Sequence, residues 1–248
     1  MATLSIPPNE RVTFRLVHED EDLLVIDKPA GLVTQPGKGH ENDTLLNGLF
    51  ARFGPLLQNL GDARDFGLLH RLDKEASGLL IVALRPRAYD ALRKSFERAA
   101  DAPEIRKFYY AVCSRAPRAP EGILDFPLAE TTGGANTMKI AHISPAGKEA
   151  ITAYRVVSTS STGALLEARP VTGRLHQIRV HLARAGAPIL GDALYAPRGV
   201  AAAWPRVALH SHRVVFTHPV SGARIDGRAP LPKDLRALLT RLRIKKPV

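Results

Sequence analysis

The sequence predicts an α+β fold: a single domain, residues 1–248, with a largely antiparallel mixed central sheet flanked by helices and loops. Strand-like segments dominate, and many of them are joined by short turns, which is typical of antiparallel sheets. Segments with helical spacing of apolar residues lie between them. No long linker rich in Gly, Ser or Pro interrupts the chain, so we expect a core over about 12–243 and a short basic C-terminal tail.

The N-terminal half predicts strands and helices in alternation. Residues 12–37 read as two short strands around an acidic turn, closed by Pro29-Ala30-Gly31. Residues 42–54 predict a helix that begins at a capping Asn or Asp and ends at Gly54. Residues 87–100 predict an amphipathic helix with Tyr89, Leu92 and Phe96 on one face.

The C-terminal half continues with strands, two of them paired around a Ser/Thr/Gly turn. Residues 172–186 predict a helix, because Leu175, Ile178 and Leu182 share one face and Gly186 supplies a stop. The other predicted elements are a strand over 104–116, a strand pair over 148–171, a hairpin over 209–226 and a leucine-striped helix over 231–246.

Composition narrows the class of protein. The chain carries 35 Lys+Arg against 24 Asp+Glu, a net charge of +11. This excess favours a polyanionic partner such as nucleic acid, although a basic chain can also be simply soluble. Aromatic residues make up 6%, too few for a broad base-stacking platform. A single cysteine excludes a disulfide framework, and without a signal segment or an apolar span we expect a cytoplasmic protein away from membranes.

The stretch GLLHRLDKEASGLLIVA, Gly67 to Ala83, places charged residues between two apolar runs. The second run is typical of a buried strand. Charges at the mouth of such a strand form either a solvated loop or a site mounted on a rigid element. The Ser77-Gly78 pair predicts a compact turn before the strand that fixes the loop, and this favours a site.

Asp73 is the candidate reactive group of this loop. Its neighbours Arg71, Lys74 and His70 favour an ionised carboxylate. Such a carboxylate can act as a nucleophile at a sugar carbon, as in retaining glycosidases. The alternative is a surface ion pair, which stabilises a protein by about 0–1 kcal/mol.

Arg174 and Arg179 fall at the start and in the first turns of the predicted helix over 172–186. Arg179 borders the apolar face, where an unpaired buried charge would be very unfavourable. A carboxylate such as Asp73 would serve as its partner. Alternatively, the Arg179 side chain extends to solvent.

The histidines do not predict a metal site. His176 and His181 are five residues apart and do not share a helix face, and no carboxylate or thiolate surrounds His210 and His212 in a known ligand spacing. The glycine-rich patterns of nucleotide-binding loops do not occur. We therefore expect neither a metal nor a nucleotide cofactor.

Five sequence blocks together resemble the RluA-type RNA pseudouridine synthase family. HRLDKEASGLLIVA resembles its HRLDxxTSGLLL signature, and TGRLHQIRVHLARAGAPILGDALY resembles its GRxHQIRxHxxxxGxPIxGDxxY block. The other three blocks are EDLLVIDKPAGLVTQPG, KFYYAV and ALHSHRVVFTHPVSG. All five occur in family order between about Leu23 and Gly222, which makes the resemblance specific.

The resemblance implies the pseudouridine synthase fold and the isomerisation of uridine in ribosomal or transfer RNA to pseudouridine, without cofactor. Asp73 would be the catalytic carboxylate, whether it attacks C1′, attacks C6 or abstracts a proton. Tyr109 would stack on the uracil or deprotonate C5, and Arg179, or else Arg174, would pair with Asp73. The resemblance and the local charge also assign RNA or substrate binding to a second set of residues: His70, Arg71, Lys74, Arg174 and His176.

The sequence departs from the family pattern at two points, and two other functions are compatible with it. Ala76 stands where the family usually has Thr, and the blocks begin by Leu23, so we expect a stand-alone, monomeric catalytic domain without an S4-type RNA-binding domain. One rival is a non-catalytic RNA-binding or RNA-folding protein on the same scaffold. The other is a glycosidase-like hydrolase, which needs a second carboxylate, and Glu75 is the near one.

Overall fold

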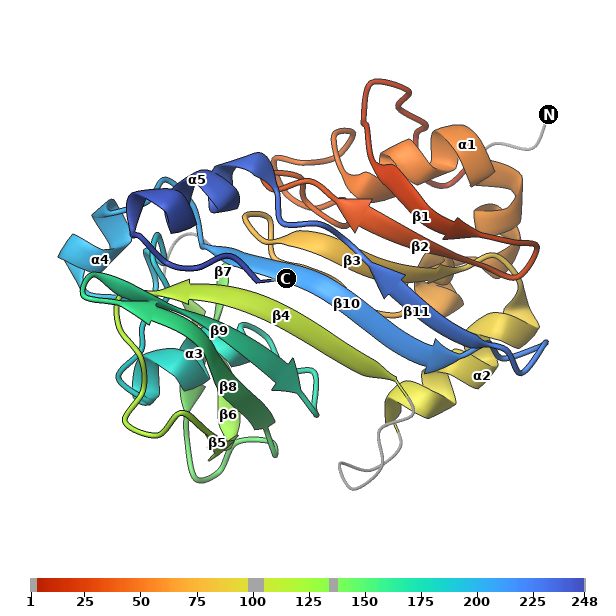
Figure 1. Cartoon of the computed structure of the whole chain (residues 1–248). Coiled ribbons are helices and arrows are strands. Elements are labelled where there is room, and N and C mark those ends of the chain that lie inside the picture. Colours follow the sequence, from red (N-terminus) through yellow and green to blue (C-terminus); the bar gives the residue numbers. More distant parts are fainter. Residues whose placement is uncertain (1–3, 98–104, 134–137, 248) are drawn as a thin grey trace. The chain divides into compact units, whose positions relative to one another are not determined.

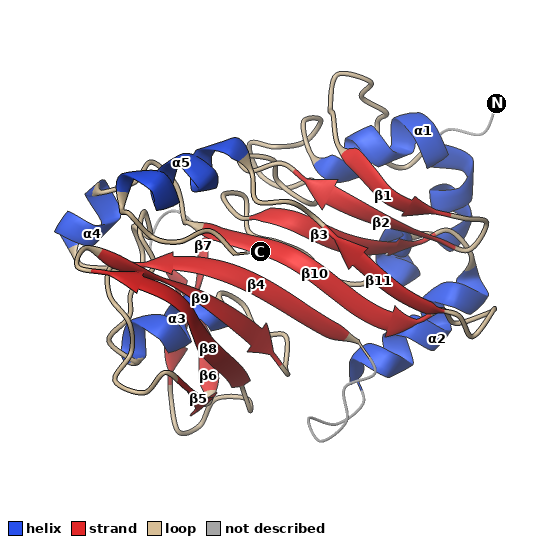
Figure 2. Ribbon diagram, viewed as in Figure 1, coloured by secondary structure: helices blue, strands red, loops and turns tan. Residues whose placement is uncertain are grey.

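The chain divides into two compact units. The computed structural model describes residues 4–97, 105–133 and 138–247. Unit 1 comprises Met1–Arg106 and Ser211–Pro230, and unit 2 comprises Lys107–His210 and Leu231–Val248. Strands and helices occur in both units (Figures 1 and 2), which confirms the predicted α+β class. That both units form one domain stays a prediction.

Unit 1 is built on a sheet with the strand order β1-β2-β3-β10, and β11 pairs with β10. The β1–β2, β2–β3 and β10–β11 pairs are antiparallel, which confirms both predicted hairpins. The strands are β1 (Arg15–Glu19), β2 (Leu23–Lys28), β3 (Ser77–Ala83), β10 (Leu209–Thr217) and β11 (Arg224–Arg228).

The core of unit 1 is centred on β2 and β3. Leu23 to Ile26 and Leu79 to Ala83 are fully buried. Both faces of these two strands are therefore covered, which explains why their sequences are continuous apolar runs rather than alternating ones. This rigid pair carries the Asp73 loop at the entrance to β3.

The helices of unit 1 are α1 (Leu45–Leu60), the 3-10 helix η1 (Asp62–Gly67) and α2 (Pro86–Glu97). The predicted end of α1 at Gly54 is wrong, because the helix continues to Leu60 and Gly61 is its C-cap. Gly54 lies inside it, where a Cβ would come within 3.0 Å of the Leu4 side chain, so this glycine permits close packing. The predicted Asn or Asp cap is also wrong: Thr44 caps α1, and Asn47 Oδ1 accepts its backbone N–H. Residues 98–100 of the other predicted helix lie outside the described residues.

Ser77 and Gly78 do not form the predicted turn, because they are the first two residues of β3. Gly78 has φ +108°, and a Cβ there would lie 2.2 Å from the carbonyl oxygen of Ser211 on β10. The glycine therefore allows two strands to approach closely, a demand that a sequence does not reveal.

We expect Gly78→Ala to lower the free energy of unfolding by about 3 kcal/mol or more, because a clash with the β10 backbone adds to an unfavourable φ. Chemical denaturation of the full chain measures this. Gly222→Ala is the matched control: Gly222 also has a positive φ, of +72°, but a Cβ there meets no atom within 4 Å. Equal losses in the two variants would contradict the close approach.

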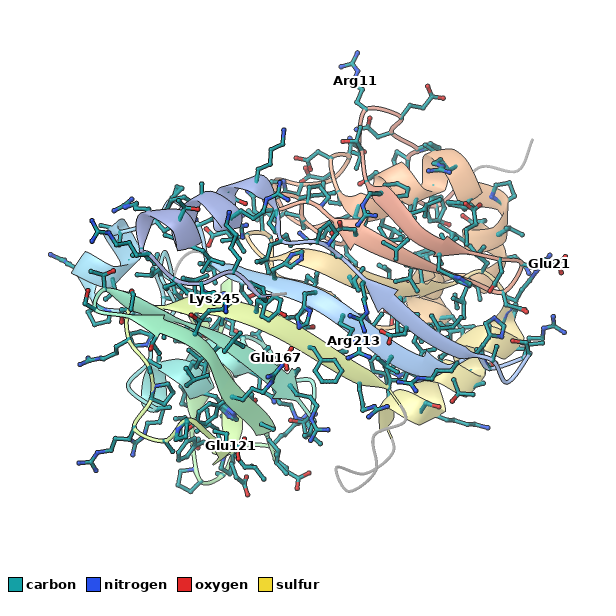
Figure 3. All side chains as sticks on the ribbon, viewed as in Figure 1. Arg11, Glu21, Glu121, Glu167, Arg213 and Lys245 are labelled. Atoms are coloured by element: carbon teal, nitrogen blue, oxygen red, sulfur yellow. The ribbon has the colours of Figure 1, made fainter. Side chains whose placement is uncertain are left out.

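Unit 2 is built on a sheet with the order β4-β9-β8-β5, in which all three pairings are antiparallel. A separate antiparallel hairpin consists of β6 and β7. Across β8 and β9, Arg155 Nε lies 2.8 Å from Glu167 Oε2, and Figure 3 labels Glu167. The strands are β4 (Arg106–Cys113), β5 (Glu121–Asp125), β6 (Leu128–Gly133), β7 (Met138–Ile143), β8 (Ile151–Ser160) and β9 (Gly163–Pro170).

The helices of unit 2 are α3 (Gln177–Arg184), α4 (Arg198–Ala202) and α5 (Lys233–Arg241). Helix α3 begins later than predicted, because His176 adopts a left-handed conformation with φ 51°. Leu175 therefore precedes the helix, yet it still packs against the core cluster of Leu128 and Val180. None of the helices in the described part of the chain is long and apolar enough to span a membrane.

Candidate active site

The Asp73 side chain is half-buried on a loop whose backbone is tied down on both sides. Thr34, itself 3% exposed, donates its hydroxyl to the carbonyl of Leu72 at 2.9 Å. The Gly31 N–H donates to the carbonyl of Lys74 at 2.8 Å, and the Ala76 N–H donates to that of Asp73 at 3.1 Å. The carbonyls that flank Asp73 therefore have fixed partners, and the carboxylate is mounted on a rigid backbone.

Lys28 provides a further anchor for this loop. Its side chain is fully buried, and Nζ donates to the carbonyls of Pro29, Leu32 and Lys74 at 2.9, 2.7 and 3.3 Å. A buried ammonium needs such acceptors. Lys28 therefore links the turn after β2 to the residue that follows Asp73.

The other predicted site residues of unit 1 surround this loop. Arg71 and Lys74 are exposed, so both cations face solvent. His70 is half-buried, and its Nε2 accepts the N–H of Ile81 at 3.2 Å, so the ring proton lies on Nδ1. Its ring also lies 5.3 Å from that of Phe96. His70 is therefore bonded to β3, whereas Arg71 and Lys74 are exposed, and Lys74 Nζ lies 3.1 Å from His40 Nε2.

Tyr109 and Lys107 occupy the same face of β4 in unit 2, two residues apart. Tyr109 is 7% exposed and lies opposite Ala168 of β9. Lys107 is 8% exposed, and burial lowers the pKa of its ammonium to about 8 from the ordinary 10.5. The structure thus places a titratable amine beside the predicted catalytic tyrosine on one strand.

Between pH 8 and 10.5, we expect the free energy of unfolding of the wild-type protein to rise by about 3 kcal/mol more than that of the Lys107→Met variant. Over this range the unfolded chain keeps the Lys107 proton and the folded chain has lost it, so raising the pH favours folding. Urea unfolding of both proteins across this range is the measurement. Parallel pH profiles in the two proteins would contradict the lowered pKa.

Arg179 does not extend to solvent, because it is 6% exposed. Its Nε donates to Asp192 Oδ2 at 2.9 Å and its Nη2 to Asp192 Oδ1 at 2.8 Å. Asp192, 1% exposed, is the carboxylate that the buried arginine requires within unit 2. It lies inside the GDALY block, but its place in the sequence does not identify it as the partner of Arg179. The pairing of Arg179 with Asp73 stays a prediction.

Tyr195 packs on the same guanidinium. The Cζ atom of Arg179 lies 5.1 Å from the centre of the tyrosine ring. The Tyr195 hydroxyl lies 2.8 Å from His176 Nδ1 and accepts the Ala141 N–H at 3.1 Å. His176, predicted to bind RNA, is therefore part of the set of residues around Arg179.

Arg174 lies before α3 rather than at its start, which corrects the prediction. The buried Gln177 side chain explains why the helix does not include Arg174. Its Oε1, on a residue 3% exposed, accepts the Arg174 N–H at 3.0 Å and the Thr172 hydroxyl at 2.8 Å. These bonds hold the preceding residues in a loop. The Arg174 side chain is exposed, and its Nε donates to the carbonyl of Glu149 at 2.9 Å.

A cluster of carboxylates and imidazoles also lies in unit 1, where ligand-type atoms of Asp20, Asp22 and His218 lie within 4.8 Å of one another. Asp20 Oδ2 lies 2.7 Å from His18 Nε2 and 3.1 Å from His218 Nε2, and Arg87 Nε donates to Asp22 at 3.1 Å. Burial raises the pKa of Asp20, but hydrogen bonds from His18 and two backbone N–H groups outweigh it and lower the pKa. The cluster is a network that joins the β1–β2 turn to the end of β10.

Comparisons with known proteins agree with these motifs. The family described as RNA pseudouridylate synthase matches residues 22–184. An uncharacterized RNA pseudouridine synthase of Synechocystis sp. is 35% identical, covering 96% of this chain and 72% of that protein. Ribosomal large subunit pseudouridine synthase D of Zymomonas mobilis is 37% identical, covering 94% of this chain and 74% of that protein.

A solved structure supports the same assignment. Human RNA Pseudouridylate Synthase Domain Containing 4 has a TM-score of 0.69 and 25% identity, and the match covers 94% of each chain. The fold and the sequence thus point to one family over most of the chain. This chain belongs to the RNA pseudouridylate synthase family and is an isomerase that converts uridine in RNA to pseudouridine.

Proposed function

We propose that Asp73, Tyr109 and Arg179 carry out this reaction on a uridine of structured RNA. Ribosomal and transfer RNA are both suitable substrates, and the name of the Zymomonas mobilis relative favours large-subunit ribosomal RNA. The observation that carries the proposal is the fixed backbone around Asp73. The family match over residues 22–184 also includes Asp73, Tyr109 and Arg179.

The reaction exchanges one bond to the sugar for another. The N1–C1′ glycosidic bond breaks, the uracil turns, and C5 bonds to C1′, while the proton leaving C5 balances the one gained at N1. Asp73 supplies the carboxylate, which acts at C1′, at C6 or as a base. Tyr109 stacks on the uracil or removes the C5 proton, and Arg179 pairs with Asp73.

The target nucleotide has to leave its stack before the base can turn, at a free-energy cost of a few kcal/mol. Phosphate contacts offset this cost, and the net charge of +11 supports them. The exposed cations Arg71, Lys74 and Arg174 are best placed for these contacts. We also assign substrate binding to His70 and His176, each of which is half-buried and hydrogen-bonded within its own unit.

We extend the proposal to the organisation of the protein. Motif residues are divided between the units, with Asp73 in unit 1 and both Tyr109 and Arg179 in unit 2. If one uridine meets all three, residues 1–248 work as a single catalytic domain. We propose that this domain acts as a monomer in the cytoplasm.

Analysis of the product tests the proposed function against both rivals. Purified protein is incubated with large-subunit ribosomal RNA and transfer RNA transcripts, and the RNA is then digested to nucleosides. Because uridine and pseudouridine have the same mass, the nucleosides are separated by liquid chromatography before they are identified by mass spectrometry. Pseudouridine supports the proposal, unchanged uridine supports a non-catalytic RNA-binding protein, and free uracil supports a hydrolase. Comparing pseudouridine maps of RNA from cells with and without the gene then identifies the uridine.

We expect the affinity for substrate RNA to fall roughly 10- to 100-fold between about 50 and 200 mM salt, because bound Lys and Arg side chains displace counterions from phosphates. Replacing Arg71, Lys74 and Arg174 together by Ala should flatten this dependence. Arg224→Ala, which removes an exposed arginine on β11, is the control. Wild-type affinity that does not change with salt would show that the basic surface plays no part.

A further inference from the structure

We propose that Asp192 and Tyr195 are positioning residues that fix the orientation of the Arg179 guanidinium for catalysis. The inference rests on the proposed function, because it takes Arg179 to act in the reaction. Arginine has a long side chain with many rotamers, so holding it in one orientation requires dedicated contacts. The structure provides these contacts on one edge and one face of the guanidinium.

Asp192 holds the edge. Both of its carboxylate oxygens accept from Arg179, at 2.9 Å from Nε and 2.8 Å from Nη2. This parallel pair fixes the plane of the guanidinium as well as its position. The two bonds to Asp192 use Nε and Nη2 of Arg179, so the Nη1 group lies on the side of the guanidinium that does not face Asp192.

The Asp192 carboxylate is itself held. Its Oδ1 also accepts the N–H groups of Leu194 and Tyr195 at 3.0 and 3.2 Å. The preceding Gly191 has φ +79°, and a Cβ there would lie 1.8 Å from the carbonyl oxygen of Arg206. Only glycine fits this turn, so the backbone presents Asp192 in one direction.

The same turn is bonded to the strand that carries Tyr109. The N–H of Leu190 donates to the carbonyl of Val112 on β4 at 2.9 Å, and the N–H of Ala208 donates to the carbonyl of Leu190 at 2.9 Å. Asp192 therefore places Arg179 relative to β4, and hence relative to Tyr109. A surface ion pair would not give this connection.

Tyr195 holds the face of the guanidinium. Its ring centre lies 5.1 Å from Arg179 Cζ, a cation–π contact. The far end of the ring is fixed, because the hydroxyl lies 2.8 Å from His176 Nδ1 and accepts the Ala141 N–H on β7. The elements β7 and α3, with the loop before α3, thus meet at this tyrosine.

The test compares Asp192→Asn with Asp234→Asn in the full-length protein. Asp234 binds Arg206, a largely buried arginine of unit 2, through a 2.6 Å contact, so its substitution also removes an ion pair. We expect kcat for pseudouridine formation to fall at least tenfold in Asp192→Asn, with the Kd for RNA within twofold of wild type. In Asp234→Asn we expect kcat per folded molecule to stay within twofold of wild type.

A second pair of variants keeps the test informative if Asp192→Asn does not fold. Tyr195→Phe keeps the aromatic face, and Tyr195→Leu removes it, so we expect Tyr195→Leu to lose several times more kcat. In a double-mutant cycle, adding Asp192→Asn to Arg179→Ala should lower kcat no further, since the group to be positioned is already gone.

The outcomes separate the inference from the proposed function. A wild-type protein that makes no pseudouridine in any RNA tested overturns the proposed function and the inference with it. An active wild type overturns the inference alone if Asp192→Asn keeps normal kcat, or if Asp192→Asn and Arg179→Ala lower kcat independently. Loss of kcat at equal RNA affinity, with no further loss in the double mutant, supports the inference.

Discussion

The Asp73→Asn variant should lose nearly all pseudouridine formation and still fold and bind RNA. Asparagine has the size of aspartate but cannot supply a negative charge or accept a proton, so we expect the rate to fall on the order of a thousandfold or more. The fold should survive because the loop is held through backbone carbonyls: Thr34 binds that of Leu72, and Lys28 and Gly31 bind that of Lys74. None of these bonds uses the Asp73 side chain.

Three measurements check this expectation: pseudouridine formed per minute, thermal unfolding and RNA affinity. Glu75→Gln is the control, since Glu75 is the half-buried carboxylate two residues further along the same loop. It should keep the rate within a few-fold of wild type. Turnover in Asp73→Asn within a few-fold of wild type would remove Asp73 from the mechanism. A dependence on both carboxylates, with uracil released, would instead favour the hydrolase.

Those parts of the fold that depend on local sequence could be predicted. The spacing of apolar residues alone predicts three of these elements: β2, β3 and α5. The β6–β7 hairpin could not be recognised in this way, because its buried Leu128 and Ala141 are stabilised by packing against Ala150 and Val180 from later in the chain. Likewise, Asp65 and Phe66 in η1 adopt positive φ angles that their residue types do not signal.

The candidate site divides in the same manner. Asp73, Tyr109 and Arg179 could be named because each stands in a recognisable motif. Lys28 could not be assigned a role, since a single lysine resembles a surface charge and one of its three acceptors, the carbonyl of Lys74, is 46 residues away. Asp192 was missed although it lies within the GDALY block, because the spacing to Arg179 does not show that the two side chains meet.

Arg179→Ala should lower both activity and stability, and Arg179→Lys should restore part of each. Removing arginine leaves Asp192, only 1% exposed, with a buried charge, which should reduce the free energy of unfolding by about 3–5 kcal/mol. For a chain of this size that corresponds to a decrease in Tm on the order of 10 °C. Lysine restores the charge but cannot form the two parallel bonds to Asp192, so its recovery should be incomplete.

The loss of activity must be separated from the loss of stability, and Arg206→Ala provides the comparison. Arg206 is also a largely buried arginine in an ion pair within unit 2, but its partner is Asp234 on α5. Both alanine variants should lose Tm, whereas only Arg179→Ala should lose kcat per folded molecule, measured below the Tm of each protein. If kcat falls equally in both, Arg179 stabilises unit 2 without a role in the reaction, and Arg174 becomes the candidate partner of Asp73.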